Sequence, residues 1–307
     1  MKIIRPAIMN DSMLVSSTVP EPAPGEVAWN PATAYAVDAE VYLASTHRRY
    51  RAVTTSTNRN PATDIPTATV PAAWVDIGPT LRWAMFDDVV GTVSSGASPL
   101  VVVVRAGSVG GLPLFELAGR TARAVLTDSP GGTVVFDRTV DLDGTIIADV
   151  YDWFFAEYQP LTDVVMTDLP GQYPSGELTL TITNTSGNAA VGVFKPGPIH
   201  DIGDTQYGAS IGILDFSKKE RDAFGRVSIL ERAFSKRANF SIMTEKTSFN
   251  RIFRLLASLR ATPCVYIGTE IYGYEPLLIY GFYRDFSIDV AYPTHHLCSL
   301  EVEGMTQ

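Results

Sequence analysis

The chain has 307 residues, of which 46% are hydrophobic and 19% charged, so it can bury more than one core and is too apolar for disorder. Its formal net charge is −9, without a long basic block, which argues against a duplex nucleic-acid partner. No apolar run approaches 18 residues, so we expect no membrane span. Cys264 and Cys298 lack zinc-site or disulfide-framework spacing, and we expect buried thiols, with no metal and no cofactor.

Residues 1–25 are expected to form an N-terminal segment that ends in a proline-rich linker. The start, "MKIIRPAIMNDSM", has too short an apolar run for a secretory signal. The stretch "VPEPAPG", 19–25, favours an extended and semi-rigid chain. Two arrangements are open for the segment: it packs on a neighbouring subunit, or it forms a strand on the protein's own sheet.

Residues 26–78 are predicted to form a small aromatic β module. Strand candidates "AEVYLAS" and "RRYRAVT" are followed by a loop rich in Pro and Thr and by "AWVDIG". This unit contains four spaced aromatic residues, Trp29, Tyr35, Tyr50 and Trp74. Rigidly held rings with polar neighbours can bind sugars, whereas a unit of this size also needs rings to fill its core.

The same stretch resembles the small chitin- and cellulose-binding modules found on secreted glycosidases. The positions that match the pattern are Trp29, Tyr35, Val37, Val41, Tyr50, Ala52, Pro61 and Trp74. One departure changes a turn, because Asp38-Ala39 stands where these modules have Gly-Asp. The resemblance implies carbohydrate binding through Trp29, Tyr35, Tyr50 and Trp74.

Residues 79–198 are predicted to form a β-sandwich, jelly-roll-like, because short strand candidates alternate with Gly, Pro and Asp turns. Two hairpins are expected. The first is "TARAVLTDSPGGTVVFDRTV", 121–140, and the second is "LTLTITNTSGNAAVGVF", 178–194.

Residues 199–307 are predicted to form a C-terminal β-rich domain with one helix at 248–260. Apolar residues fall at helical spacing at Phe249, Ile252, Phe253, Leu256 and Leu259. Thr247 or Ser248 is the expected N-cap. The flanking sequence is typical of β-strands, so the helix is expected to lie across an antiparallel sheet.

The sequence contains none of the familiar catalytic motifs that we searched for. It lacks GxSxG, HExxH, a P-loop and a dinucleotide-binding glycine pattern. His200, Asp201 and Asp204 are the best metal candidates, but loop aspartates usually bond turn amides. Neighbouring carboxylates suggest glycosidase chemistry or, more simply, solvated turns; these are Asp87, Asp88, Asp149, Asp152 and Glu157. We therefore expect that the protein is not an enzyme.

Three stretches resemble tail-tip and baseplate proteins of long-tailed bacteriophages: 76–95, which contains "DIGPTLRWAMFD", 200–242, and 277–304. The resemblance implies a structural subunit similar to distal tail proteins, in which residues 199–307 assemble into a ring. The implied partners are copies of itself and other tail proteins, and the implied location is the virion, assembled in the host cytoplasm. Two alternatives are a receptor-binding or carbohydrate-binding appendage that contacts cell-surface polysaccharide, and a tail-borne glycan hydrolase.

Overall fold

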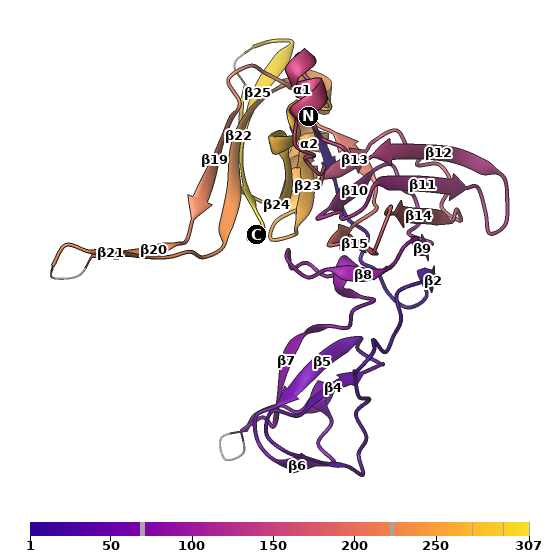
Figure 1. Cartoon of the computed structure of the whole chain (residues 1–307). Helices are drawn as coiled ribbons and strands as arrows, with labels where there is room; N and C mark the ends of the chain where they lie inside the picture. Colours follow the sequence, from indigo (N-terminus) through magenta and orange to yellow (C-terminus); the bar gives the residue numbers. More distant parts are fainter. Residues whose placement is uncertain (68–70, 222–223, 272, 291, 307) are drawn as a thin grey trace.

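The computed structural model describes residues 1–67, 71–221, 224–271, 273–290 and 292–306. The protein is mostly β, as predicted, and its strands pair in antiparallel sheets. Figure 1 shows a C-terminal sheet, a β-sandwich and a small module. The chain starts in the C-terminal sheet, crosses the sandwich to the small module, returns to the sandwich and ends in the C-terminal sheet. The small module is thus nested within the sandwich, and the sandwich within the C-terminal unit.

The C-terminal sheet has the order β17-β1-β23-β24-β25-β22-β18 in the described part of the chain, and β19 also pairs with β22. Its strands are β1 (Lys2–Ile4), β17 (Ile199–Asp201), β18 (Asp204–Thr205), β19 (Ser210–Asp215), β22 (Phe234–Glu245), β23 (Cys264–Ile267), β24 (Leu278–Asp289) and β25 (His295–Gly304). Burial alternates along β25, where Cys298, Leu300 and Val302 face the core. This period of two is what a sheet covered on one side requires.

The predicted helix is present as α2 (Phe249–Ser258), preceded by a 3-10 turn, η3 (Lys246–Ser248). Ile252, Leu256 and Leu259 are buried in the core of the C-terminal sheet, as the apolar spacing predicted. Phe253 is instead 51% exposed and meets Phe286 edge-to-face at the rim of the core. Ser248 holds the N-cap position, but its side chain makes no capping hydrogen bond. A further 3-10 turn, η4 (Glu275–Leu277), precedes β24.

The N-terminal segment lies on the protein's own sheets, which is the second of the two arrangements left open. Strand β1 pairs with both β17 and β23, and Ile3 and Ile4 are completely buried. Strand β2 (Leu14–Ser17) pairs with β9 of the sandwich. The segment therefore belongs to two folded parts, and the proline-rich stretch follows its second strand.

The sandwich has two layers around one apolar core. Among the described residues, one layer has the order β12-β11-β14-β9-β2, and the other contains β13-β10-β16 and β15-β8. Its strands, besides β2, are β8 (Ser94–Ala97), β9 (Leu100–Val104), β10 (Leu112–Phe115), β11 (Thr121–Thr127), β12 (Val134–Asp141), β13 (Val164–Met166), β14 (Leu178–Thr183), β15 (Asn188–Val191) and β16 (Val193–Phe194). Side chains from both layers share this core, as in other sandwiches.

Of the two predicted hairpins, the first is confirmed and the second is wrong. Strands β11 and β12 pair antiparallel across the turn after Thr127. Strand β14 pairs with β9 and β11, whereas β15 pairs with β8 in the opposite layer. The connecting turn is held by Asn184, whose side-chain amide donates to the Asn188 carbonyl at 2.9 Å. Apolar alternation fixes which face of a strand is buried, but it does not fix which layer the strand joins.

The small module contains the sheet β4-β5-β7 and the pair β3-β6 in its described part. Their bounds are β3 (Ala34–Tyr35), β4 (Glu40–Leu43), β5 (Arg48–Ala52), β6 (Ser56–Thr57) and β7 (Trp74–Pro79), with a 3-10 turn η1 (Pro61–Thr63). The Glu21 carboxylate joins the module to the sandwich. Its side chain is 8% exposed and accepts hydrogen bonds from Thr80 at 2.7 Å and from the Trp83 indole at 3.2 Å. His47 contacts the same carboxylate at 2.9 Å and stacks on Trp83.

The sandwich and the C-terminal sheet share an apolar interface. It is formed by Ile4, Phe115, Val193, Val265, Ile267, Leu278 and Tyr280. Beside it, the Lys195 ammonium donates to the Phe86 carbonyl at 2.6 Å and to Asp88 at 2.8 Å; Phe86 ends a 3-10 turn, η2 (Ala84–Phe86). The Tyr280 hydroxyl donates to the same Asp88 oxygen at 3.0 Å. These contacts fix the orientation of the two parts.

Candidate assembly surfaces

A narrow β-hairpin, here called the arm, projects from the C-terminal sheet (Figure 1). It comprises the described residues from 216 to 232, with strands β20 (Lys218–Arg221) and β21 (Val227–Leu230) paired antiparallel. Every residue of both strands is exposed. An isolated two-stranded hairpin is marginally stable in water, so this length of arm lacks the support that a strand pair normally needs.

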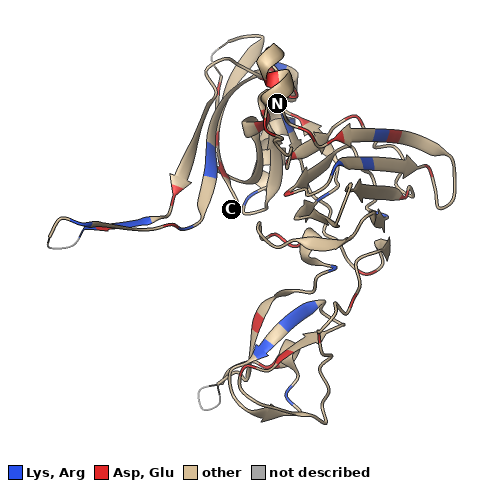
Figure 2. Cartoon of the chain, viewed as in Figure 1, with Lys and Arg blue, Asp and Glu red and all other residues tan. Residues whose placement is uncertain are grey.

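The two faces of the arm differ in chemistry. Val227 lies opposite Arg221, and Ile229 lies opposite Lys219. Directly opposed residues share one face of an antiparallel pair, so two β-branched apolar residues and two basic residues lie together. The side chains of Val227 and Ile229 are 55% and 66% exposed. We call this the basic-apolar face, and Figure 2 shows the basic residues along the arm.

A second exposed surface is the aromatic loop, residues 145–158, which contains the short helix α1 (Val150–Phe155). Its base is closed, because the Gly144 amide donates to the Gln159 carbonyl at 2.8 Å and the Gln159 amide to the Thr145 hydroxyl at 3.1 Å. The Asp149 carboxylate caps α1 by accepting from the Asp152 amide at 2.9 Å. The loop is thus an ordered projection rather than a loose connection.

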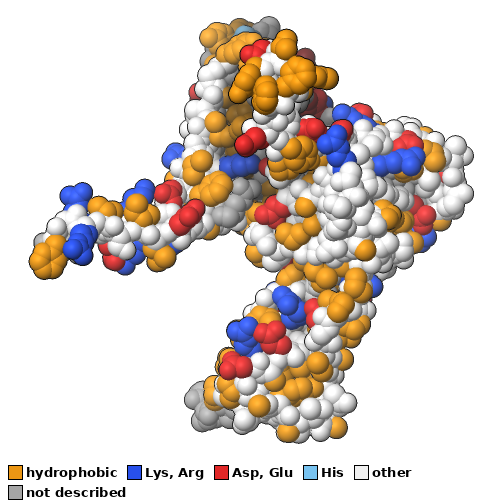
Figure 3. All heavy atoms as spheres, in the orientation of Figure 1, with side chains coloured by type: hydrophobic (Ala, Val, Ile, Leu, Met, Phe, Trp, Pro, Cys, Tyr) orange, Lys and Arg blue, Asp and Glu red, His pale blue; other side chains and the backbone are white. Residues whose placement is uncertain are grey.

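Large apolar side chains on this loop face solvent. Their exposed fractions are Ile146 67%, Ile147 50%, Val150 75%, Tyr151 69%, Trp153 71%, Phe154 72%, Phe155 67% and Tyr158 51%. Figure 3 shows them as a gathering of hydrophobic atoms over α1, at the top of the view. Single exposed apolar residues are ordinary, but a contiguous group of this kind marks an interaction surface.

Helix α1 was missed by sequence reasoning, which treated Asp149, Asp152 and Glu157 only as candidate carboxylates. The usable signal was local: an Asp three residues before another Asp, followed by an apolar run without a buried-strand alternation. A helix of six residues is too short to show a 3.6-residue period.

The four predicted sugar-binding residues come together as the core of the small module. Tyr35, Tyr50 and Trp74 are only 9%, 6% and 6% exposed, and Trp29 packs against them. The Tyr35 and Trp74 rings meet edge-to-face with centroids 5.2 Å apart, and the Trp74 indole donates to the Arg59 carbonyl at 2.9 Å. Three of the four rings therefore present no open face to solvent. Their role in carbohydrate binding stays a prediction, while their packing is that of a core.

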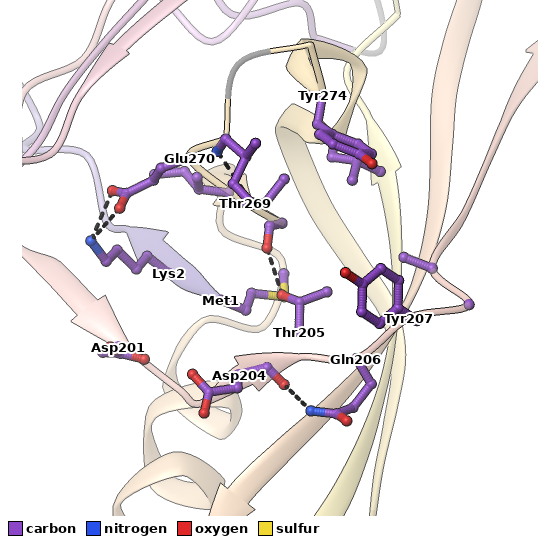
Figure 4. Close-up of a pocket in the computed structure, with 16 residues that line it drawn as sticks. Met1, Lys2, Asp201, Asp204, Thr205, Gln206, Tyr207, Thr269, Glu270 and Tyr274 are labelled. Carbon is purple, nitrogen blue, oxygen red and sulfur yellow. Dashed lines mark hydrogen bonds and ion pairs between the residues drawn. The ribbon is translucent and has the colours of Figure 1, made fainter.

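An open cavity of about 480 Å³ lies at one end of the C-terminal sheet. Tyr207 and Tyr274 line one side, and the ion pair between Lys2 and Glu270, at 2.8 Å, lies on the other (Figure 4). Asp204 lines the cavity between them. The cavity thus combines aromatic rings with carboxylates.

Several of the remaining candidate groups have structural partners. Asp201 accepts the Gly203 amide at 2.9 Å, as loop aspartates do. Within the described residues, no group of three or more His, Cys, Asp or Glu side chains is arranged to hold a metal. Asp87 accepts hydrogen bonds from the Thr92 hydroxyl at 2.8 Å and the Val89 amide at 3.1 Å, and burial raises the pKa of its carboxyl. Both cysteines are buried free thiols, as predicted.

No helix in the part of the chain that the structure describes is long and apolar enough to cross a membrane. Comparison of the chain with protein-family models, with curated proteins and with solved structures found no match. The functional argument therefore depends on the surfaces described above.

Proposed function

We propose that this protein is a structural subunit of a bacteriophage tail tip or baseplate, which assembles into a ring through its C-terminal unit. Its partners are copies of itself and other tail proteins. The observation that carries the proposal is the arm, a projecting hairpin in which every strand residue is exposed. The sequence resemblance described above supplies the identity of the assembly.

The arm favours assembly for an energetic reason. Fully burying a side chain such as Val227, Ile229 or Leu230 stabilises by about 1.5–3 kcal/mol, and these side chains are 55–66% exposed in the single chain. The strand β19, at the root of the arm, pairs with β22 and with no other strand among the described residues, so it also offers a free edge. A contact between the arm of one copy and a different surface of the next is heterologous, and repetition of such a contact gives a ring when the rotation between successive copies closes.

The test is light scattering of the full-length protein over a range of concentrations, with negative-stain imaging of any oligomer. We expect a concentration-dependent closed oligomer. Ile229→Ser should weaken it, because the residue lies on the basic-apolar face, whereas Ser228→Ala on the other face should leave it intact. An oligomer that is equally stable in both variants would show that the arm does not hold the ring together.

A second candidate function, glycan binding by the virion, is favoured by the cavity beside Tyr207 and Tyr274. Exposed tyrosine rings can stack on sugar faces while carboxylates bond the hydroxyls. Retention of the full chain on an immobilised bacterial polysaccharide should fall with Tyr274→Ala. Equal retention of the wild type and this variant would exclude the cavity as the glycan site.

A further inference from the structure

We infer that the basic-apolar face of the arm binds the aromatic loop of a neighbouring copy. The inference rests on the proposed ring assembly and specifies which two surfaces meet. Each surface is exposed in the single chain: Ile229 is 66% exposed and Phe154 is 72% exposed. Neither surface is therefore covered by the other within one chain.

The two surfaces have opposite charge. Between Phe216 and Arg232 there are five basic and three acidic residues, a net charge of +2. The aromatic loop carries Asp149, Asp152 and Glu157 and no basic residue, a net charge of −3. No Lys or Arg occurs anywhere between Arg138 and Lys195.

On the arm, Lys218 and Lys219 already pair with Glu220 and Asp215, at 2.5 and 3.3 Å. Part of the charge on each surface nevertheless remains available to a partner. Among the described residues, no ion pair is found between a basic side chain and Asp149, Asp152 or Glu157. Arg221 and Arg232 likewise have no acidic partner in the described part. Association of these surfaces would pair both sets of charges, and complementary charge also raises the rate of encounter and fixes the register.

The apolar chemistry fits as well. Trp153, Phe154 and Phe155 present aromatic rings, and the arm offers two β-branched side chains flanked by Lys219 and Arg221. Aliphatic side chains pack on ring faces, and cations bind to the same faces by cation–π attraction. Aromatic residues in a closed, capped loop form a rigid anchor of the kind that dominates binding energy at protein interfaces.

A lipid surface is a poorer occupant for the aromatic loop. Interfacial segments usually carry Lys and Arg on the polar side, which bind anionic headgroups. This loop carries only carboxylates, and its flanks toward Asp141 and Asp163 are acidic too. The charge therefore favours a basic protein surface, and the arm is a basic surface on the same chain.

The test places a photoreactive phenylalanine analogue at Ile229 in the full chain and crosslinks the oligomer. Mixing isotope-labelled and unlabelled copies distinguishes crosslinks between copies from those within one copy. We expect mass spectrometry to find the crosslink in residues 146–158 of another copy. The matched control carries the analogue at Ser228, on the opposite face of the arm, and should not crosslink to the loop.

A second measurement uses Trp153→Ser. Because Trp153 is 71% exposed, its loss should not lower the melting temperature of the dilute monomer, but it should raise the dissociation constant of the oligomer by roughly tenfold or more. Val134→Ser, at an exposed valine of β12, is the matched control and should leave assembly unchanged.

Three results would overturn the inference. Oligomers whose Ile229 crosslinks map outside the aromatic loop would refute this pairing and leave the ring proposal intact. A protein that stays monomeric, without crosslinks between copies, would refute both. Loss of binding to phosphatidylcholine–phosphatidylglycerol vesicles in Trp153→Ser, with unchanged oligomerisation, would assign the loop to a membrane.

Discussion

Lys195 is a buried cation at the joint between the sandwich and the C-terminal sheet, and its replacement by Met tests how that joint is held. The side chain is 6% exposed, and its ammonium donates to the Phe86 carbonyl at 2.6 Å and to Asp88 at 2.8 Å. Met is unbranched and fills much of the same space as the Lys stem. The substitution therefore removes the two hydrogen bonds and the charge while keeping most of the packing.

The expected loss of stability follows from the surroundings of the two acceptors. Hydrogen bonds to charged groups contribute about 1.5–3 kcal/mol each, and a buried carbonyl left without a donor is similarly costly. Phe86 is 8% exposed, so its carbonyl loses the Lys195 donor at a site where water does not easily replace it. Asp88 has a side chain that is 65% exposed, and water can replace its lost partner, so that bond contributes about 1 kcal/mol or less. Relief from burying the ammonium offsets part of the loss, and we expect a net destabilisation of about 1–3 kcal/mol.

Urea unfolding followed by far-ultraviolet circular dichroism measures this change, with Lys218→Met on the exposed arm as the control. The control should stay within about 0.5 kcal/mol of the wild type, as surface substitutions usually do. If Lys195→Met proved as stable as the wild type or more stable, desolvation of the ammonium would outweigh its bonds, and the reasoning above would be wrong.

Three further predictions concern single groups. Burial acts to raise the pKa of Asp88, but the hydrogen bond and the charge of Lys195, together with the hydrogen bond from Tyr280, outweigh burial and hold the pKa below its ordinary value. Stability from Asp88 is therefore present above the unfolded-state pKa and lost as pH falls through the folded-state pKa. The stability difference between the wild type and Asp88→Asn in urea should then be larger at pH 7 than at pH 3, and an equal difference would contradict this origin. Glu21→Ala should release the small module from the sandwich, seen as faster proteolysis at the joint with about 1.5–3 kcal/mol lost from its charged hydrogen bonds; unchanged proteolysis would mean that packing alone holds the joint. Burial raises the pKa of Cys264 to about 12 and of Cys298 to about 11, so both thiols should react with a thiol reagent at pH 8 only after unfolding, and rapid labelling of the native protein would contradict their burial.

Local patterns predicted those elements that depend on neighbours in sequence. The spacing of Ile252, Leu256 and Leu259 predicted α2 because one helix face was enough to specify it. The hairpin of β11 and β12 was predicted because its turn and its pairing lie in the same stretch. By contrast, the pairing of Ile3 with His200 and Tyr266 depends on residues 197 and 263 positions away, which no local pattern contains.

The candidate surfaces were harder to predict than the fold. The residues of β21, such as Val227 and Ile229, read as an ordinary strand, and their exposure depends on the absence of a covering layer. The spacing of Tyr50 and Trp74 suggested a sugar-binding surface. A small module has few other large apolar side chains, however, and it buries these rings to form its core. Sequence pattern shows which residues can pack, whereas exposure is decided by what else is nearby.

The nested order of the chain also determines the order in which its parts can fold during synthesis. Strand β1 leaves the ribosome well before its partners β17 and β23, which follow only after the sandwich and the small module have been made. Strands β24 and β25, at the centre of the same sheet, come last. Because domains fold largely as units during translation, the sandwich can form while the sheet that supports the arm is still incomplete. The C-terminal sheet is thereby completed only when strands β24 and β25 have been translated.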